Sequence, residues 1–247
     1  DGAALARGRN SGEKRAMAVR ATRRSLGRLW RGLRRAALIL VAGLLLGVLA
    51  LRFVNPPITW LMISEWRRLG AIERQWVPLA AMAPHLPLAA AAAEDANFCR
   101  HRGFDLDGIR AALADDTRLR GGSTISQQTA KNVFLWPARS WLRKGLEAGF
   151  TALIETLWGK RRIMEVYLNV AEFDEGVFGV EAAARRYFGL SAAELGPQRS
   201  ARLMAVLPDP KRRSPVSGTR FIQTRGAAIQ RGAATIREDG RAACFLR

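Results

Sequence analysis

The sequence is poor in the residues that most often staple a small domain or bind a metal. Its 247 residues include two cysteines and two histidines: Cys99, Cys244, His85 and His101. Two cysteines exclude a small disulfide-stapled domain and a cysteine-rich zinc module, and two histidines do not favour a histidine-based metal site. We therefore treat Cys99 and Cys244 as structural or incidental. Disorder throughout is also excluded, because 49% of the residues are apolar.

Acidic residues are scarce relative to basic ones, since 21 Asp and Glu face 40 Lys and Arg, a net charge of +19. The excess is concentrated in residues 1–35, which carry 11 basic and two acidic side chains. Such a run is typical of arms that bind nucleic acid. That interpretation leaves unexplained why the basic run directly precedes an apolar segment, so we favour membrane topology and expect no nucleic-acid partner.

Sixteen residues without a charge, 36–51, follow the basic run. As a helix they would cover about 24 Å, a little less than the hydrocarbon core of about 30 Å, and flanking residues extend the predicted span to 36–54. A cleaved signal peptide and a soluble helix are the alternatives, but a soluble helix would show a polar face. Because basic flanks stay in the cytoplasm, residues 1–35 are predicted to be a cytoplasmic tail. Residues 55–247 would then form a periplasmic domain on a single-pass inner-membrane anchor.

The remainder of the chain predicts a mainly α-helical domain. Residues 58–69 carry Trp60 and Trp66 among basic residues, which is typical of an amphipathic helix at a lipid surface, although packing on the core would use the same pattern. Apolar residues recur at three- and four-residue spacing over 147–170, and 180–188 and 200–207 predict short helices.

Sustained alternation of apolar and polar residues is absent from the sequence, so we expect no extended strands. Long loops are expected at 99–108, 116–128 and 170–179. Pro78, Pro84 and Pro87 are expected to break the chain before an alanine-rich run that leads to Glu94.

Glu94 is the first candidate for chemistry. It ends an apolar run and leads into a polar segment. An acid in that position is placed for a raised pKa and hence for proton transfer. The plainer interpretation is that it flanks a helix.

A second candidate region, residues 121–132, begins with two glycines that allow close backbone approach and continues with polar side chains. It lacks the Lys-Ser/Thr ending of a nucleotide-triphosphate loop, but Lys131 could meet a phosphate. Arg139, Arg143 and Lys144 then cluster near Glu147, which suits an anionic group beside a carboxylate. An exposed basic face with an Arg143–Glu147 pair is the alternative.

Taken in order, these segments resemble the peptidoglycan transglycosylases of glycosyltransferase family 51. Residues 94–103 are similar to that family's E-D-x-x-F-x-x-H-x-G motif, 121–132 to G-G-S-T-I-x-Q-Q-x-A-K-N, and 143–147 to R-K-x-x-E. Residues 161–169 (RRIMEVYLN) and 205–210 (AVLPDP) resemble the fourth and fifth motifs. The single predicted span and the wording of the motifs look most like the monofunctional biosynthetic enzymes of Gram-negative bacteria.

The resemblance implies a lysozyme-like fold and the polymerisation of lipid II into β-1,4-linked glycan with inversion and release of undecaprenyl pyrophosphate. Glu94 would be the general base, Glu147 a second acid, and Lys131 and Arg139 would hold the donor pyrophosphate. Further substrate-binding residues carried over from the motifs are Phe98, His101, Ser123, Thr124, Gln127, Gln128, Asn132 and Arg143.

The resemblance implies that no cofactor is required. It allows Mg²⁺ or Mn²⁺ to assist the reaction from a position near Glu147. Expected partners are lipid II, the nascent glycan strand and the inner membrane, with cell-wall synthase or division-complex proteins as further candidates. Two other functions compete: a membrane-anchored lysozyme-like hydrolase or lytic transglycosylase, which needs a protonated second carboxyl, and an inactive scaffold, which needs no Glu94.

Overall fold

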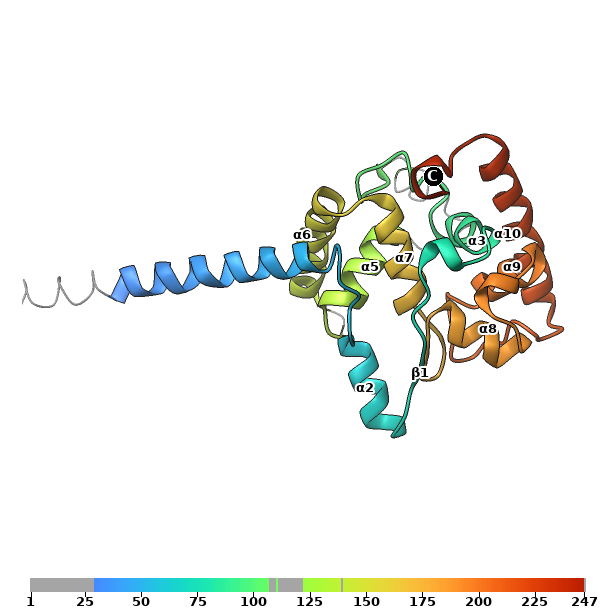
Figure 1. Ribbon diagram of the computed structural model, residues 1–247, viewed down its shortest axis with the longest axis horizontal. Coiled ribbons are helices and arrows are strands. Elements are labelled where there is room, and N and C mark those ends of the chain that lie inside the picture. The colour runs from blue at the N-terminus through green and yellow to red at the C-terminus, as the bar shows by residue number, and fades with distance from the viewer. Residues whose placement is uncertain (1–28, 107–109, 111–121, 139, 247) are drawn as a thin grey trace, which may run out of the picture. The chain divides into compact units, whose positions relative to one another are not determined.

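The computed structural model describes residues 29–106, 110, 122–138 and 140–246, and the chain divides into two units, residues 1–50 and 51–247. In the first unit the described residues form one helix, Leu29–Ala50, which is long and apolar enough to cross a membrane (Figure 1, blue). This helix begins earlier than the predicted span of 36–54 and ends before it, since residues 51–54 are not helical. Basic side chains can continue a helix at an apolar boundary because their long stems reach past it.

The second unit is mostly helical, as the sequence predicts. Its helices, with two short 3-10 turns, are α2 (Trp60–Leu69), η1 (Leu79–Ala81), α3 (His85–Glu94), α5 (Ile125–Phe134), α6 (Trp141–Leu157), α7 (Lys160–Val170), α8 (Val180–Phe188), η2 (Ala192–Glu194), α9 (Pro197–Ala205), α10 (Arg220–Glu238) and α11 (Ala243–Leu246).

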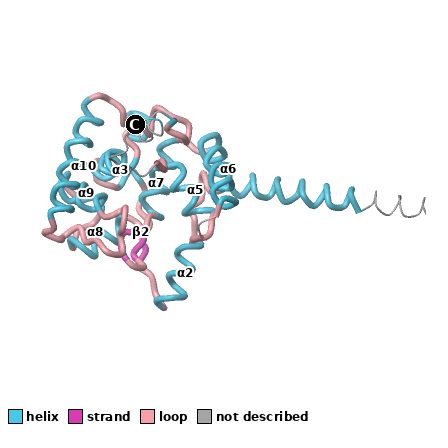
Figure 2. Tube along the Cα trace, turned by 180° about the vertical axis from the view of Figure 1, so that it is seen from behind, coloured by secondary structure: helices cyan, strands magenta, loops and turns pink. Residues whose placement is uncertain are grey.

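Helix α7 lies at the centre of this unit and packs against α3, α5, α6, α8 and α11. Seven of its 11 residues are buried, so it presents apolar side chains on several faces, as expected of a core helix. Figures 1 and 2 show α3, α9 and α10 on one side of α7 and α5 and α6 on the other. Helix α3 ends at Glu94.

A small sheet completes the domain. Strand β3 (Val177–Phe178) pairs in parallel with β1 (Glu73–Arg74) and antiparallel with β2 (Glu172–Asp174). The sequence predicts a loop over 170–179, and strands of two or three residues are too short to show the period-two alternation on which a sequence prediction depends.

Several element boundaries differ from the predictions. The periodic segment 147–170 is two helices, because α6 ends at Leu157 and Gly159 is the N-cap of α7. Pro87 does not break the chain but lies in the first turn of α3, where its missing N–H has no helical acceptor to serve. Helix α5 begins inside the predicted loop 116–128, of which 116–121 lie outside the described residues. Helix α8 has the predicted bounds, and Gly189 ends it in the left-handed conformation.

Helix α10 was not predicted at all. Its buried residues include Ile222, Ile229 and Ile236, which are spaced by seven positions and so lie on one face of a helix. That spacing was the available signal. The helix packs on α9 and on α3, the helix that ends at Glu94.

Candidate active site

The site is built where the end of α3 meets α5. Glu94 is the last residue of α3, and its Oε2 accepts a hydrogen bond from Gln128 Nε2 of α5 at 3.0 Å. Lys131 follows Gln128 by three positions in the same helix, which places both side chains on one face. A single contact between two helices therefore brings the predicted acid beside the predicted cation.

Glu94 is held in an environment that suits proton transfer. Its side chain is 16% exposed, and burial raises the pKa of the carboxyl above its usual value. The Gln128 hydrogen bond and the charges of Arg225 and Lys131 oppose this rise in pKa, while Asp95 adds to it. A carboxylate with a raised pKa has more affinity for a proton, as a general base requires.

The amine of Lys131 interacts electrostatically with Glu94 and with a second group of charged residues on α6. Burial lowers the pKa of its amine, Arg143 and Lys144 lower it further, and Glu147 and Glu94 act in the opposite direction. Lys131 therefore lies in the fields of both predicted acids and both neighbouring cations.

Glu147 sits on the buried face of α6 and holds two of those cations. Arg143 Nη1 donates to its Oε2 at 2.9 Å, and Lys144 Nζ bonds its Oε1. The spacing of three and four residues in one helix explains the geometry, and Ser140 caps the helix by accepting from the Arg143 N–H. The alternative interpretation of these residues is an exposed basic face with an Arg143–Glu147 pair. The pair forms, but the Glu147 side chain is buried and only 3% exposed.

The remaining predicted residues at the start of α5 and within it have other contacts. Thr124 is the N-cap and forms a reciprocal capping box with Gln127, so both side chains are buried at the start of the helix and hold it in place. Ser123 is half-buried and accepts from Gln128 through its carbonyl, and Asn132 is half-buried. Contact of these four residues with substrate stays a prediction.

Asp95, the residue after Glu94, holds the end of α3 against the start of α5. Its Oδ2 accepts from the backbone N–H of Ile125, the first residue of α5, at 3.0 Å, where the helix dipole favours an anion. Its Oδ1 lies 2.9 Å from His101 Nε2, and His101 Nδ1 accepts from the Gly103 N–H. His101 therefore donates from Nε2, and it acts on the loop rather than on an exposed surface.

Gly103 allows that loop to approach α6. It has φ +90°, and a Cβ there would lie 2.7 Å from Thr151 Cγ2, so only glycine fits. Its carbonyl accepts from the Thr124 hydroxyl at 2.7 Å, which joins the first motif to the second.

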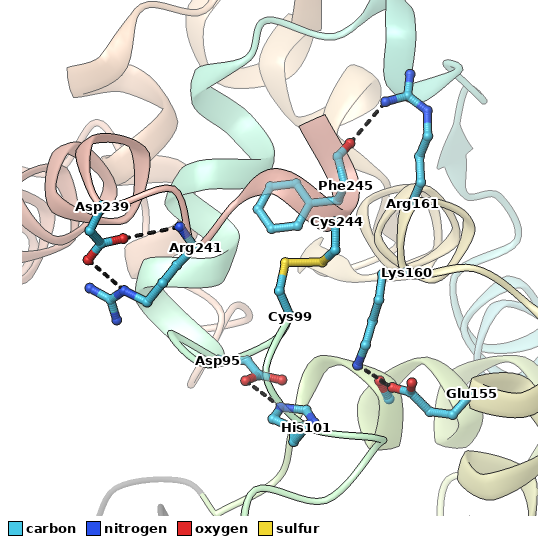
Figure 3. Close-up of a disulfide and its surroundings, with 11 residues drawn as sticks. Asp95, Cys99, His101, Glu155, Lys160, Arg161, Asp239, Arg241, Cys244 and Phe245 are labelled. Atoms are coloured by element: carbon cyan, nitrogen blue, oxygen red, sulfur yellow. Dashed lines mark hydrogen bonds and ion pairs between the residues drawn. A yellow bond between two sulfur atoms is a disulfide. The ribbon is translucent and has the colours of Figure 1, made fainter. Parts of the chain in front are cut away.

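Phe98 lies behind the site rather than on its surface, in contrast to the prediction that it binds substrate. It is 1% exposed, and it packs against Phe245 and His101 while the Lys160 amine lies 4.3 Å from its ring centre. Beside it Cys99 and Cys244 form a disulfide that ties the loop after Glu94 to α11 (Figure 3). The structural role allowed for the two cysteines is confirmed.

Arg225 is a residue of the site that the sequence analysis missed. It comes from α10, and its Nη2 lies 3.5 Å from Glu94 Oε1. No signal in the sequence connects two residues that are 131 positions apart. Arg139, by contrast, was predicted to bind pyrophosphate but lies outside the described residues.

Comparison with known proteins gives a consistent result. The sequence matches the family described as Transglycosylase over residues 62–234. Proteins named biosynthetic peptidoglycan transglycosylase are 54% identical in Rhodospirillum centenum, covering 87% of this chain and 96% of that protein, and 49% identical in Caulobacter vibrioides, covering 84% and 92%. The protein of that name in Xanthomonas campestris pv. campestris is 47% identical, covering 90% and 92%.

Proposed function

Because this chain belongs to the transglycosylase family and is a peptidoglycan glycosyltransferase, we propose that it polymerises lipid II, with the growing glycan strand as donor and lipid II as acceptor. The single observation that carries the proposal is the contact between Glu94 and Gln128. It sets a buried carboxylate beside the helix face that carries Lys131, and the Lys131 amine interacts electrostatically with Glu147 and its two cations.

In the proposed reaction Glu94 takes the proton from the 4-hydroxyl of the acceptor sugar. The oxygen attacks the anomeric carbon of the donor, and a new C–O bond forms as the bond to pyrophosphate breaks. The electron pair of that bond leaves with the pyrophosphate, and the α-linked donor becomes a β-1,4 product. Lys131 stabilises the charge that grows on the departing group.

Glu147 is assigned a supporting role in this reaction. By binding Arg143 and Lys144 it fixes where their charges lie, and we place both cations on the pyrophosphate with Lys131. Arg139 is proposed to join them, as the motif resemblance implies.

The same pairing argues against the rival hydrolase. A glycosidase that protonates its leaving group needs a carboxylic acid with a proton to give. Glu147 is instead paired with Arg143 and Lys144, which suits a residue that holds cations near a leaving diphosphate. A pyrophosphate leaves without protonation when cations surround it, so the arrangement supports transfer from a diphosphate donor.

A lipid-linked substrate requires the site to work at a membrane, and the domain carries exposed aromatic and aliphatic side chains that suit this. In α2, Trp60 and Trp66 are about half exposed, beside Arg67 and Arg68. Trp141, at the start of α6, is 92% exposed. Such residues are typical of surfaces that enter the lipid headgroup region.

We further propose that the helix Leu29–Ala50 is a single-pass anchor in the inner membrane with a cytoplasmic N-terminal tail and a periplasmic catalytic domain. The basic residues before the helix support the orientation. The Cys99–Cys244 disulfide supports the compartment, because disulfides persist outside the reducing cytosol.

A resident metal is not part of the proposal. The described residues include no cluster of three His, Cys, Asp or Glu side chains that could hold one, and both oxygens of Glu147 are engaged by cations. No step is assigned to a metal, and Mg²⁺ or Mn²⁺ near Glu147 stays a prediction.

The proposal is tested with the purified full chain in detergent and labelled lipid II, with and without a chelator. We expect long products that a muramidase cleaves. Anhydro-sugar or hydrolysed products, formed instead of polymer, would favour the hydrolytic alternative and overturn the proposal.

A further inference from the structure

Helix α10 contains two similar stretches, Arg225-Gly226-Ala227-Ala228 and Arg231-Gly232-Ala233-Ala234. The two glycines let α10 approach its neighbours closely. A Cβ at Gly226 would lie 3.2 Å from Arg202 Cγ in α9, and one at Gly232 would lie 3.3 Å from Ala92 Cβ in α3. Because α10 packs this closely, Arg225, the residue before Gly226, reaches the end of α3, where Glu94 lies.

The two arginines point in different directions. Six residues turn a helix by about 600°, which leaves them about 120° apart around the axis. Arg225 is partly buried against the end of α3, whereas Arg231 is exposed. The chain thus offers an arginine at the site and a matched arginine away from it, in the same helix and the same local sequence.

Arg225 meets Glu94 on the side opposite to Gln128. Its Nη2 lies 3.5 Å from Glu94 Oε1 and 3.5 Å from the carbonyl oxygen of Ala93. Glu94 Oε1 and Arg225 Nε are both buried without a hydrogen-bond partner among the described residues. Glu94 Oε2 therefore accepts the hydrogen bond from Gln128. Glu94 Oε1 lies near the positive charge of Arg225 and keeps a lone pair for a proton from substrate.

Among the described residues, charged or titratable groups that act on Glu94 come from several of the elements packed around it. Lys131 comes from α5, Asp95 is the next residue, Tyr167 comes from α7 and Arg225 from α10. Of the two cations, Arg225 favours the ionised carboxyl more than Lys131 does. In the proposed reaction Lys131 is also shared with the bound diphosphate, which weakens its effect on Glu94. Arg225 is the cation that stays with the base throughout.

We propose that Arg225 is a positioning residue for the glycosyl transfer: from α10 it holds Glu94 Oε1 toward the acceptor hydroxyl and keeps the carboxyl ionised while substrate is bound. This inference rests on the proposed function, in which Glu94 is the general base.

The test compares the full chain with its R225Q, R225K and R231Q variants in detergent, with lipid II, measuring kcat and KM from pH 4.5 to 9. Without the Arg225 charge the pKa of Glu94 rises, so we expect the acid limb of kcat in R225Q to move to higher pH by about one unit. That shift corresponds to a roughly tenfold lower rate on the limb, with KM nearly unchanged. R225K should restore the wild-type limb, because the charge is kept, and R231Q should match wild type.

A profile of R225Q that superimposes on that of R231Q, or a change confined to KM, would overturn the inference. If R225Q does not fold, R225K decides alone: an unmoved acid limb with less than about threefold loss of kcat supports the charge role, and a larger loss with an unmoved limb rejects it. E94Q separates the two levels. Absence of polymer from the wild-type chain rejects the proposed function. Retained polymerisation in E94Q rejects Glu94 as the base, whereas its loss together with a wild-type profile for R225Q rejects only the role of Arg225.

Discussion

Gln128 donates a hydrogen bond to Glu94 across 3.0 Å, and this bond joins the C-terminal end of α3 to the second turn of α5. The two residues belong to different motifs, 34 positions apart. Because the capping box of Thr124 and Gln127 fixes where α5 begins, it also fixes where Gln128 meets the acid. The geometry at Glu94 thus depends on a helix N-terminus as much as on Glu94 itself.

The first prediction concerns Glu94 as the base. Glu94→Gln keeps the size of the side chain but removes its proton affinity, so lipid II polymerisation should fall by at least about 100-fold. Glu238→Gln, at an exposed acid near the end of α10, serves as the matched control. Gel analysis of labelled glycan measures both. Near-normal polymer from the Glu94 variant would remove this residue from the role.

The second prediction concerns the cation on the leaving group. Lys131→Ala should lower kcat by about 100-fold, because a preorganised charge at the departing pyrophosphate is lost. Arg231→Ala removes the same charge from an exposed position and should leave turnover unchanged. Equal turnover in the two variants would contradict the assignment of Lys131.

The third prediction follows from the raised pKa of Glu94. A carboxyl whose pKa is higher in the folded state favours folding in its protonated form, and that contribution is lost as pH rises through the folded pKa. Glu94→Gln imitates the protonated form, so the variant should be more stable to urea than wild type at pH 7. The difference should shrink below the usual value of 4.5. Equal unfolding free energies at pH 7 would mean that burial of the charge carries no cost.

The fourth prediction concerns the disulfide. Cys99 and Cys244 are 145 residues apart, and a cross-link of that span typically stabilises a domain by about 2–4 kcal/mol. The double variant C99S/C244S should lose about that much unfolding free energy. It should retain polymerisation at temperatures where it stays folded, because the proposed reaction assigns no step to either sulfur. Loss of activity in a fully folded double variant would show that the loop after Glu94 needs the covalent tie.

The sequence was informative where a signal is local. Helix α8 has its predicted bounds because its apolar spacing and the left-handed Gly189 lie within ten residues. The ordered motifs singled out Glu94, Lys131 and Glu147, whose charges interact in the fold. It was misleading where one pattern spans two elements. The spacing over 147–170 runs through Gly159, and only the packing of α7 against α5 and α6 explains why the chain turns there.

Long-range relationships were beyond the sequence for a different reason. Arg225 reaches Glu94 because two glycines let α10 lie close to α3 and α9. No local sequence pattern indicates that the three helices pack so closely. Phe98 shows the converse. Its place in a motif suggested contact with substrate, but an aromatic ring between Phe245, His101 and Lys160 serves to support the loop.

The bond between Cys99 and Cys244 also bears on how the enzyme matures. Cys99 lies five positions after Glu94 and is synthesised 145 residues before Cys244. Its thiol therefore stays unpaired while most of the domain is made. In that interval it is open to exchange with thiols of other molecules, and such mixed disulfides resolve slowly without a catalyst. The rate at which newly made chains gain full heat resistance should therefore depend on the oxidising and isomerising machinery around them as well as on their own sequence.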